Sequence, residues 1–284
     1  MSRVLEIYFQ KHPERYEEYL DSKKRYLNGE SLTIISSTNM YIKNRKELSK
    51  LLKEDNINIK LNGQKYTYNE KAFKSIKTEK DAYWLGFMYA DGNVNELRMV
   101  CDLSMAEKDY DHLCKFRNYV SKDLKLIKRK SRIERYNKEY YSYRCYVANK
   151  KIVENLIKWN CNWSKTYDVE FPDFIPEELM SHFIRGFFDG DGCICNTTQH
   201  VLNFTGASKN FLIQLQSYLN IKLGMNINKL NKTKSKAYNI AWGSKKDILS
   251  FYNYIYKNAT VFLDRKYFVF NDILGRSKTK SQKS

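Results

Sequence analysis

The sequence of 284 residues carries 50 basic and 32 acidic side chains, a formal net charge of +18. Hydrophobic residues make up 42% of it and aromatic residues 15%, which excludes wholesale disorder, and the length permits two or three units with separate cores. No apolar stretch approaches the roughly 20 residues that cross a bilayer, and no signal-peptide pattern opens the chain. We therefore expect an intracellular protein with no membrane partner.

The excess of positive charge is spread over the whole chain. Residues 1–77 have 16 basic and 10 acidic side chains (+6), residues 78–172 have 18 and 14 (+4), and residues 173–284 have 16 and 8 (+8). The 23 tyrosines and 15 phenylalanines are interleaved with these charges. This pattern favours a nucleic acid that lies across the molecule over a basic protein with no particular ligand.

The cysteines and histidines indicate neither disulfides nor a zinc site. The six cysteines form no disulfide framework and no pair of Cys-x-x-Cys motifs, and the four histidines are scattered. Cys193 and Cys195 would share one face of a strand, but no second pair accompanies them. We therefore expect reduced thiols.

Residues 1–56 are predicted to form a small all-α domain. Helical patterns cover residues 14–28, 31–38 and 43–55, and Ser31 can cap the second of these helices. Three short helices, the last rich in lysine and arginine, are typical of a helix-turn-helix whose final helix enters a major groove. The alternative is an ordinary three-helix bundle with a solvated basic face. The candidate DNA contacts in this domain are Lys43, Arg45 and Lys46.

Residues 57–78 are predicted to form a basic linker. The segment is polar, contains Asn-Gly turn chemistry at Asn62, and shows little apolar periodicity. Its alternating lysines and tyrosines are compatible with a chain that lies extended along a partner.

The rest of the chain contains an internal repeat. The segment "YWLGFMYADGNV" at residues 83–94 matches "FIRGFFDGDGCI" at residues 183–194, an offset of 100. After the first copy we expect strands near 97–105, 125–136 and 139–148 and helices near 106–120 and 149–160. After the second we expect strands near 193–198, 201–207, 226–233 and 237–243 and helices near 208–223 and 245–256. These patterns predict an α+β duplication with halves at 79–172 and 173–274, followed by a disordered basic tail at 275–284.

The repeated motif places small residues four apart, at Gly86 and Ala90 in one copy and at Gly186 and Gly190 in the other. Such spacing lets two helix backbones approach closely, so we expect the two motif helices to pack on each other with their C-terminal ends together. Those ends are Asp91 and Asp191, each followed by a glycine suited to the left-handed cap position.

The two aspartates would lie at the negative ends of two helix dipoles and beside each other's charge. A cation would offset this repulsion. Carboxylate oxygens with open coordination positions suit Mg²⁺, which keeps water ligands, lowers the pKa of an attacking water and stabilises a leaving oxygen. The alternative is that Asp91 and Asp191 are only cap or turn residues.

The two segments "WLGFMYADG" and "IRGFFDGDG" resemble the motifs of the LAGLIDADG homing endonucleases, in the single-chain form that carries both halves. The resemblance covers residues 79–274, with a helix-turn-helix-like extension before it. It implies two αββαββα half-domains about an internal pseudo-twofold axis, a monomer whose two sheets form a saddle over double-stranded DNA. It also implies a staggered double-strand break by metal-dependent hydrolysis, with Mg²⁺, or Mn²⁺ in its place, bound by Asp91 and Asp191.

The first motif departs from the family pattern at Tyr89, where the first acid usually stands. That acid is not the essential metal ligand, so its counterpart Asp189 is predicted to be dispensable. The family also places a lysine near the end of each half, which by position implies catalytic roles for Lys165 and Lys266. Glu107 and Ser208 fall where the family tends to carry a polar residue near the scissile strand.

Basic residues in the predicted strands are candidate DNA contacts, because one face of each strand can pack on helices while the other reaches bases and phosphates. In the first half these are Lys128, Arg129, Lys130, Arg132 and Arg135, and in the second half Lys229, Lys232, Lys234 and Lys236. The alternative function is a DNA-binding regulator, or an RNA maturase, built on the same scaffold without cleavage activity.

Overall fold

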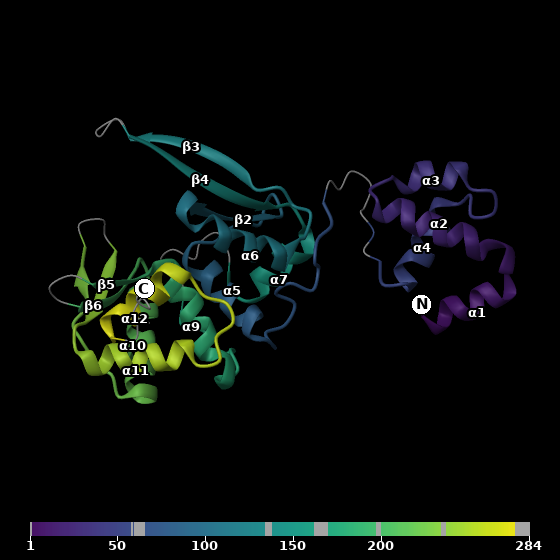
Figure 1. Ribbon diagram of the computed structural model, residues 1–284. Coiled ribbons are helices and arrows are strands. Elements are labelled where there is room, and N and C mark those ends of the chain that lie inside the picture. Colours follow the sequence, from purple (N-terminus) through teal and green to yellow (C-terminus); the bar gives the residue numbers. More distant parts are fainter. Residues whose placement is uncertain are drawn as a thin grey trace, which may run out of the picture. The chain divides into compact units, whose positions relative to one another are not determined.

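The computed structural model describes residues 2–57, 59, 66–133, 138–161, 170–196, 200–233 and 237–275. The chain divides into two compact units, Met1–Tyr68 and Asn69–Ser284 (Figure 1). The predicted tail lies outside the described residues apart from Gly275. In the described ranges, no helix is long and apolar enough to cross a membrane.

The first unit is all-α and has one helix more than predicted. Its elements are α1 (Arg3–Lys11), the short 3-10 helix η1 (Pro13–Arg15), α2 (Tyr16–Leu27), α3 (Leu32–Thr38) and α4 (Arg45–Glu54). Ser2 caps α1 by accepting from the backbone N–H of Leu5. Leu5 and Phe9 of α1 enter the core with Tyr19, Leu48 and Leu52. The additional helix therefore completes the apolar core that the other helices leave open on one side.

The linker is shorter than predicted, because residues 69–78 belong to the second unit. Phe73 is fully buried, and its carbonyl oxygen accepts from the indole N–H of Trp159 at 2.6 Å. The backbone N–H of Asn69 donates to the carbonyl oxygen of Val120 at 2.8 Å. Only a few apolar residues anchor this otherwise polar segment, and they do not recur with a helix or strand period.

The second unit contains two half-domains of the same design, as the repeat predicts. The first consists of α5 (Glu79–Ala90), β1 (Asn93–Asn95), β2 (Val100–Ala106), the 3-10 helix η2 (Glu107–Asp109), α6 (Tyr110–Val120), β3 (Ile127–Ile133), β4 (Lys138–Val147) and α7 (Lys150–Lys158). The second consists of α9 (Glu177–Asp191), β5 (Gly192–Asn196), β6 (His200–Gly206), α10 (Lys209–Leu223), β7 (Asn231–Lys232), β8 (Tyr238–Trp242) and α11 (Lys245–Tyr256). The strand orders β1-β2-β4-β3 and β5-β6-β8-β7 are equivalent, and every pairing is antiparallel. The predicted α+β fold with two αββαββα halves is confirmed.

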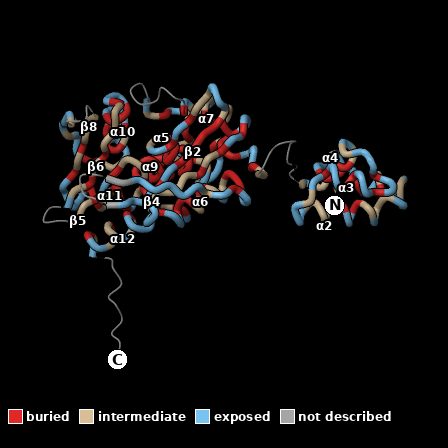
Figure 2. The backbone as a smooth tube through the Cα atoms, turned by 90° about the horizontal axis from the view of Figure 1, so that it is seen from above, coloured by how far each residue is buried: buried red, intermediate tan, exposed pale blue. Residues whose placement is uncertain are grey.

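A helix that was not predicted, α12 (Asp264–Ile273), follows α11. Its Phe270 is fully buried and its ring lies 5.6 Å from that of Phe188 and 6.3 Å from that of Phe251, between centroids. The helix therefore closes the core of the second half-domain. Figure 2 shows the buried residues running along α5, α9 and β2, through the middle of the unit.

Candidate metal centre between the motif helices

The two motif helices, α5 and α9, pack backbone against backbone. A Cβ added at Gly86 would lie 2.0 Å from the carbonyl oxygen of Phe183, and one added at Gly186 would lie 1.9 Å from that of Tyr83. Both distances are far shorter than any real contact between such atoms, so only glycine fits at either position. The two contacts are equivalent under the repeat, since Tyr83 and Phe183 are 100 residues apart. The predicted close approach is confirmed.

The C-terminal ends of these helices also meet. Asp91 is the C-cap of α5 and Asp191 is the last residue of α9. A Cβ added at Gly190 would lie 2.3 Å from the Cβ of Ala90 and 3.4 Å from Oδ2 of Asp91. Asp91 is exposed and Asp191 partly exposed. The two acids thus end adjacent helices at a place that solvent reaches.

The glycines after the two acids do not adopt the predicted left-handed conformation. Gly192 has φ −84° and ψ 162°, and among the described glycines φ is positive only at Gly29, Gly224 and Gly275. Glycine is required at these two positions because neighbouring atoms leave no room for a Cβ, and not because φ is positive. A Cβ at Gly92 would lie 2.6 Å from the carbonyl oxygen of Met88, and one at Gly192 would lie 2.7 Å from that of Phe188. Each chain turns back against the last turn of its own helix.

Lys266, predicted to assist catalysis, is buried beneath the end of α9. Its side chain belongs to α12, the residue is 4% exposed, and Nζ donates to the carbonyl oxygens of Phe188 at 2.6 Å and Asp189 at 2.8 Å. A third carbonyl, that of Gly192, accepts at 2.5 Å. Burial lowers the pKa of Lys266 to about 8, against the opposing charges of Asp189 and Asp91. In this arrangement its donors cap α9.

This cap changes the explanation for the acid at the helix end. The sequence predicts a cation that offsets the two negative dipole ends and the repulsion between the two acids. In the second half-domain, the Lys266 ammonium already places a positive charge against the last carbonyls of α9. A buried lysine has no sequence mark that distinguishes it from a solvated one, so sequence reasoning missed this role.

Asp189, predicted to be dispensable, is an internal structural residue. It is 1% exposed and its Oδ2 accepts from the Tyr83 hydroxyl at 2.7 Å and from the backbone N–H of Leu263 at 2.8 Å. Burial raises its pKa, although Lys266 and these hydrogen bonds oppose the increase. The counterpart Tyr89 donates to the carbonyl oxygen of Trp159 at 2.5 Å. In each half, this position of the motif helix is thus hydrogen-bonded to a later segment of the chain. An aspartate accepts the hydrogen bond in the second half, and a tyrosine donates it in the first.

A buried ion pair also joins the two halves at the N-terminal end of α5. Arg185 is fully buried, and its Nη2 lies 2.6 Å from Oε1 of Glu79. Its other nitrogens donate to the carbonyl oxygens of Val261 at 2.9 Å and Ile255 at 2.5 Å. Glu79 in turn accepts from the backbone N–H of Thr260 at 2.6 Å. Sequence reasoning missed this pair because it depends on which helix packs on α5.

The predicted DNA contacts in β3 fall on two different faces of the strand. Lys128 and Lys130 lie opposite Tyr143 and Tyr141, whereas Arg129 lies opposite Ser142 on the other face. Lys128 forms an ion pair with Glu107 at 2.9 Å, which accounts for that acid without a catalytic role. Arg129 shares its face with Arg144, which is not among the predicted contacts and is bound to Asp102. Arg135 lies outside the described residues, and so does the side chain of Arg132.

The remaining predicted residues are only partly placed. Lys229 and Lys232 are exposed, and Lys232 lies on the short strand β7. Ser208 is buried and caps α10 by accepting from the backbone N–H of Phe211 at 3.2 Å, which explains it as a structural residue. Lys165, Lys234 and Lys236 lie outside the described residues. Lys43, Arg45 and Lys46 are at or near the start of α4 in the first unit.

The open face of the second sheet carries amides, hydroxyls and thiols. Residues that alternate with the buried Ile194, Leu202, Phe204 and Ile240 point away from the core. In the described parts of the four strands, none of these outward-facing residues is charged. The polar ones are Cys193, Cys195, Asn203, Thr205, Asn231 and Asn239. The two thiols lie 3.4 Å apart between sulfur atoms, and both cysteines are free, as predicted.

Residues 178–256 match the model of a family described as the LAGLIDADG-like domain. The second half-domain is thus similar to LAGLIDADG-like domains. The first half-domain repeats its strand order and helix arrangement, so the whole second unit has the two-half LAGLIDADG fold. The homing endonuclease I-WcaI bound to its DNA recognition sequence matches with a TM-score of 0.52 at 15% identity, over 69% of this chain and 90% of that one. At that identity the likeness shows the fold alone.

The chain is also similar to two further proteins. The N-terminal LAGLIDADG domain of DUF199/WhiA is 16% identical, with a TM-score of 0.45, over 69% of this chain and 92% of that one. The probable translation initiation factor IF-2 of Methanocaldococcus jannaschii is 25% identical over 282 residues, which cover 87% of this chain. The chain spans only 22% of the length of that curated protein.

The residues at the helix ends fit a hard cation such as Mg²⁺ better than a soft transition metal. In the ranges that the structure describes, no group of three or more histidine, cysteine, aspartate and glutamate side chains could hold a metal. Mg²⁺ needs only one or two carboxylates when waters and phosphate oxygens complete its shell. Asp91 and Asp191 supply two carboxylates with exposed surface beside them. Among the described residues, Cys193 and Cys195 supply two thiols nearby, but no third histidine or cysteine completes a soft-metal site with them.

Proposed function

We propose that the second unit is a site-specific endonuclease that makes a staggered double-strand break in a long DNA target. The observation that carries this proposal is the meeting of two acids, Asp91 and Asp191, at the ends of helices whose backbones touch through Gly86 and Gly186. A protein that only needed to end two helices would gain nothing from placing carboxylates at both negative dipole ends.

In the proposed reaction, Asp91 and Asp191 hold divalent metal, Mg²⁺ or in its place Mn²⁺, and water is the nucleophile. The bound metal would supply a more acidic water and stabilise the leaving oxygen. The protein supplies the fixed distance between the two acids, because the crowded glycine contacts leave the helix ends little freedom to separate. Lys266 keeps the last turn of α9 in place and so positions Asp191.

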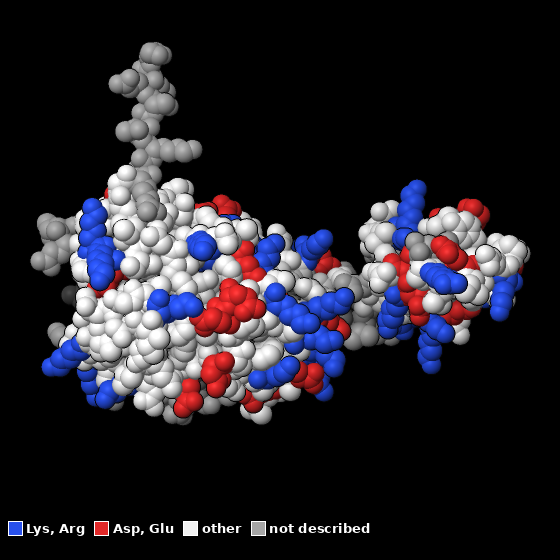
Figure 3. Space-filling model, turned by 90° about the horizontal axis from the view of Figure 1, so that it is seen from below, with Lys and Arg blue, Asp and Glu red and all other residues white. Residues whose placement is uncertain are grey.

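Duplex DNA would lie across the open faces of the two sheets. The first sheet offers Arg129 to phosphates and base edges, beside Arg144, which Asp102 holds in place, and the second offers Asn203 and Asn239. Amide side chains form bidentate hydrogen bonds with adenine, and arginine forms them with guanine. Figure 3 shows basic and acidic side chains intermingled on the visible face of the second unit, so a uniform basic surface does not cover that face.

The test is a selection of cleaved sites from a randomised duplex library with Mg²⁺, beside the variants Asp91→Asn and Asp191→Asn. We expect the wild-type protein to enrich one long sequence and both variants to lose cleavage but keep binding. Asp173→Asn, an exposed acid ahead of α9, is the matched control and should cut normally. A wild-type protein that binds one sequence tightly and cuts nothing with Mg²⁺ or Mn²⁺ contradicts the proposal.

A second candidate function is binding without cleavage, to DNA as a regulator or to RNA as a maturase. The observation in its favour is the Lys266 cap, since a buried ammonium already offsets the dipole beside Asp191 without metal. Under this function the same library experiment would give a protected sequence and no cut, and Asp91→Asn would leave affinity unchanged with or without Mg²⁺.

A further inference from the structure

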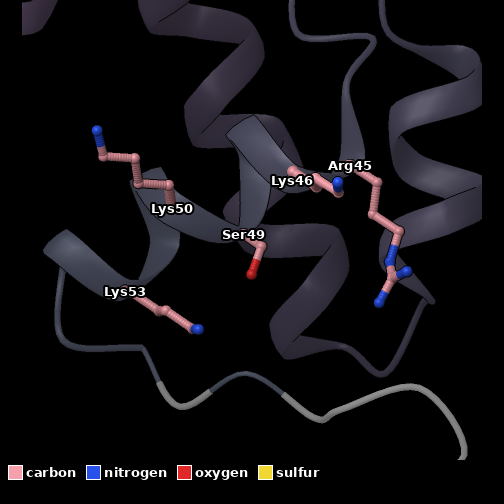
Figure 4. A pocket seen from close by; sticks show the side chains of 5 residues that line it. All are labelled: Arg45, Lys46, Ser49, Lys50 and Lys53. Atoms are coloured by element: carbon pink, nitrogen blue, oxygen red, sulfur yellow. The ribbon is translucent and has the colours of Figure 1, made fainter.

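The exposed side of α4 carries a compact group of cations. Arg45, Lys46, Ser49, Lys50 and Lys53 line a surface hollow of about 430 Å³, and we call these five residues the α4 stripe (Figure 4). Their spacing of one, three or four residues places them on one side of the helix. The stripe spans roughly 12 Å along the helix axis, from a rise of about 1.5 Å per residue.

The stripe is held rigidly, because the other side of α4 is in the core of the first unit. Leu48 and Leu52 are fully buried and Leu51 is 5% exposed. Asn44 caps the helix by accepting from the backbone N–H of Lys46 at 2.8 Å. The cations are therefore presented by a fixed backbone, which lowers the entropy cost of engaging a ligand.

The acids of the first unit are largely engaged elsewhere. Glu47 pairs with Arg15 at 2.7 Å, Asp55 pairs with Lys23 at 2.6 Å, and Glu18 accepts from the backbone N–H of Ile42 at 2.7 Å. No ion pair between described residues includes a cation of the stripe. Residues 1–57 hold 11 basic and 9 acidic side chains, a net charge of only +2. The positive charge of this surface thus comes from where the basic and acidic side chains lie, and not from the net charge of the unit.

We infer that the α4 stripe binds the phosphate backbone of double-stranded DNA without reading its sequence. Lysine, arginine and serine are among the side chains that contact phosphates, and phosphate contacts fix register without carrying sequence information. Guanine is the one base that arginine and lysine also read through paired hydrogen bonds. The stripe contains no amide to read adenine and no apolar group to contact a thymine methyl. The helix-turn-helix prediction expected a base-reading helix, and this composition favours a backbone contact.

The inference rests on the proposed function in one respect, that the second unit also binds duplex DNA. A sequence-independent module joined to a specific one raises overall affinity, because its binding becomes intramolecular. The stripe would lengthen the time that the protein stays on DNA around its target, while the sheets alone select the sequence.

Two charge-matched variants test the inference, both in the full chain with Asp191→Asn so that cleavage does not interfere. The stripe variant is Lys46→Gln, Lys50→Gln and Lys53→Gln. The control is Arg3→Gln, Lys11→Gln and Lys24→Gln, three exposed cations of α1 and α2. Glutamine is a good helix former, and circular dichroism verifies that both variants fold.

Binding is measured by fluorescence anisotropy on the selected target, on a scrambled duplex and on duplex RNA, between 50 and 200 mM salt. Removing three phosphate contacts should make the slope of log affinity against log salt concentration shallower by about 2.7. Over this salt range, the affinity of the stripe variant should therefore fall about 40-fold less than that of the control. The loss of affinity at low salt should be equal on the target and the scrambled DNA.

Three results would overturn the inference. These are equal behaviour of the two variants, a loss confined to the selected target with an unchanged salt slope, and a loss confined to RNA. Absence of cleavage by the wild-type chain would instead remove the proposed nuclease function and leave the stripe result standing, because the salt dependence can be measured on the scrambled duplex, which requires no cleaved target.

Discussion

Arg185 of α9 reaches across the helix interface and binds Glu79 of α5 at 2.6 Å, with no part of the arginine exposed. Burial by itself would raise the pKa of Glu79, but hydrogen bonds from Thr260 and Val261 and the Arg185 charge hold it below its usual value. A carboxyl whose folded pKa is depressed stabilises the protein above its unfolded pKa, and this contribution is lost as the pH falls through the folded value.

Glu79→Gln should therefore lower the free energy of unfolding near neutral pH, by about 2 to 4 kcal/mol, because Arg185 stays buried with its charge unpaired. Urea unfolding at pH 7 and at pH 3 to 4 measures this. The difference between wild type and variant should shrink at the lower pH, while Glu178→Gln, an exposed acid in α9, should change little at either. A difference that is constant over this range would contradict the assigned role.

Gly86→Ala and Gly186→Ala should each destabilise the second unit strongly. The added methyl would meet a carbonyl oxygen of the partner helix at 2.0 or 1.9 Å, so the helices must move apart, at a cost of about 3 kcal/mol or more. Gly243→Ala is the matched control, because its Cβ would lie an ordinary 3.7 Å from the carbonyl oxygen of His200. Thermal unfolding followed by near-ultraviolet circular dichroism compares the three. Equal melting temperatures would refute the packing argument.

The two acids at the end of α9 should respond to substitution in opposite ways. Asp191→Asn should abolish cleavage with little change in stability, because the residue is partly exposed. Asp189→Ala should lower stability by about 1 to 3 kcal/mol, because the Tyr83 hydroxyl and the Leu263 N–H lose a buried acceptor. Denaturant titration beside a cleavage assay separates the two effects, and a stable but inactive Asp189→Ala protein would show that this residue acts in the reaction.

Lys266→Met should act mainly on stability. The carbonyl oxygens of Phe188, Asp189 and Gly192 would lose their donor inside the protein, at a cost of about 1 to 3 kcal/mol. If the lysine instead served the reaction directly, cleavage would fall while the urea midpoint stayed unchanged. Lys257→Met, at an exposed lysine just after α11, controls for the loss of a charge.

Adjacent residues of β3 should contribute unequally to DNA binding. Arg129 is on the open face of its sheet, whereas Lys128 is on the opposite face and bound to Glu107. Arg129→Gln should reduce the affinity for the target and make the slope of log affinity against log salt concentration shallower by about 1. Lys128→Gln should change neither. Anisotropy titrations at several salt concentrations measure both, and a larger effect of Lys128→Gln would place DNA on the other side of the strand.

The repeat, the order of its elements and the contact between motif helices could be predicted because each leaves a periodic mark. Gly86 and Gly186 are such marks, since a glycine in a helix is costly without a packing reason. What could not be predicted depends on tertiary neighbours. Lys266 reads as one more surface lysine until α12 folds beneath α9, and α12 itself follows no simple apolar period.

The strands show the same limit. The segment predicted as a strand over residues 226–233 pairs only at Asn231–Lys232, because the backbone N–H of Asn228, within the segment, donates instead to the side chain of Gln216 in α10. The alternation in β3 was visible in the sequence, but the face that would meet DNA was not, since it depends on where α6 and η2 lie.

The buried pair Glu79 and Arg185 occurs once in the molecule, although the fold is duplicated. The positions equivalent to them under the repeat are Leu179 and Leu85. Two copies of the second half would therefore bury two arginines with no carboxylate between them, and two copies of the first half would leave two glutamates without a cation. Each half has become specific for the other, so exchanging or duplicating one half would require these four positions to change together.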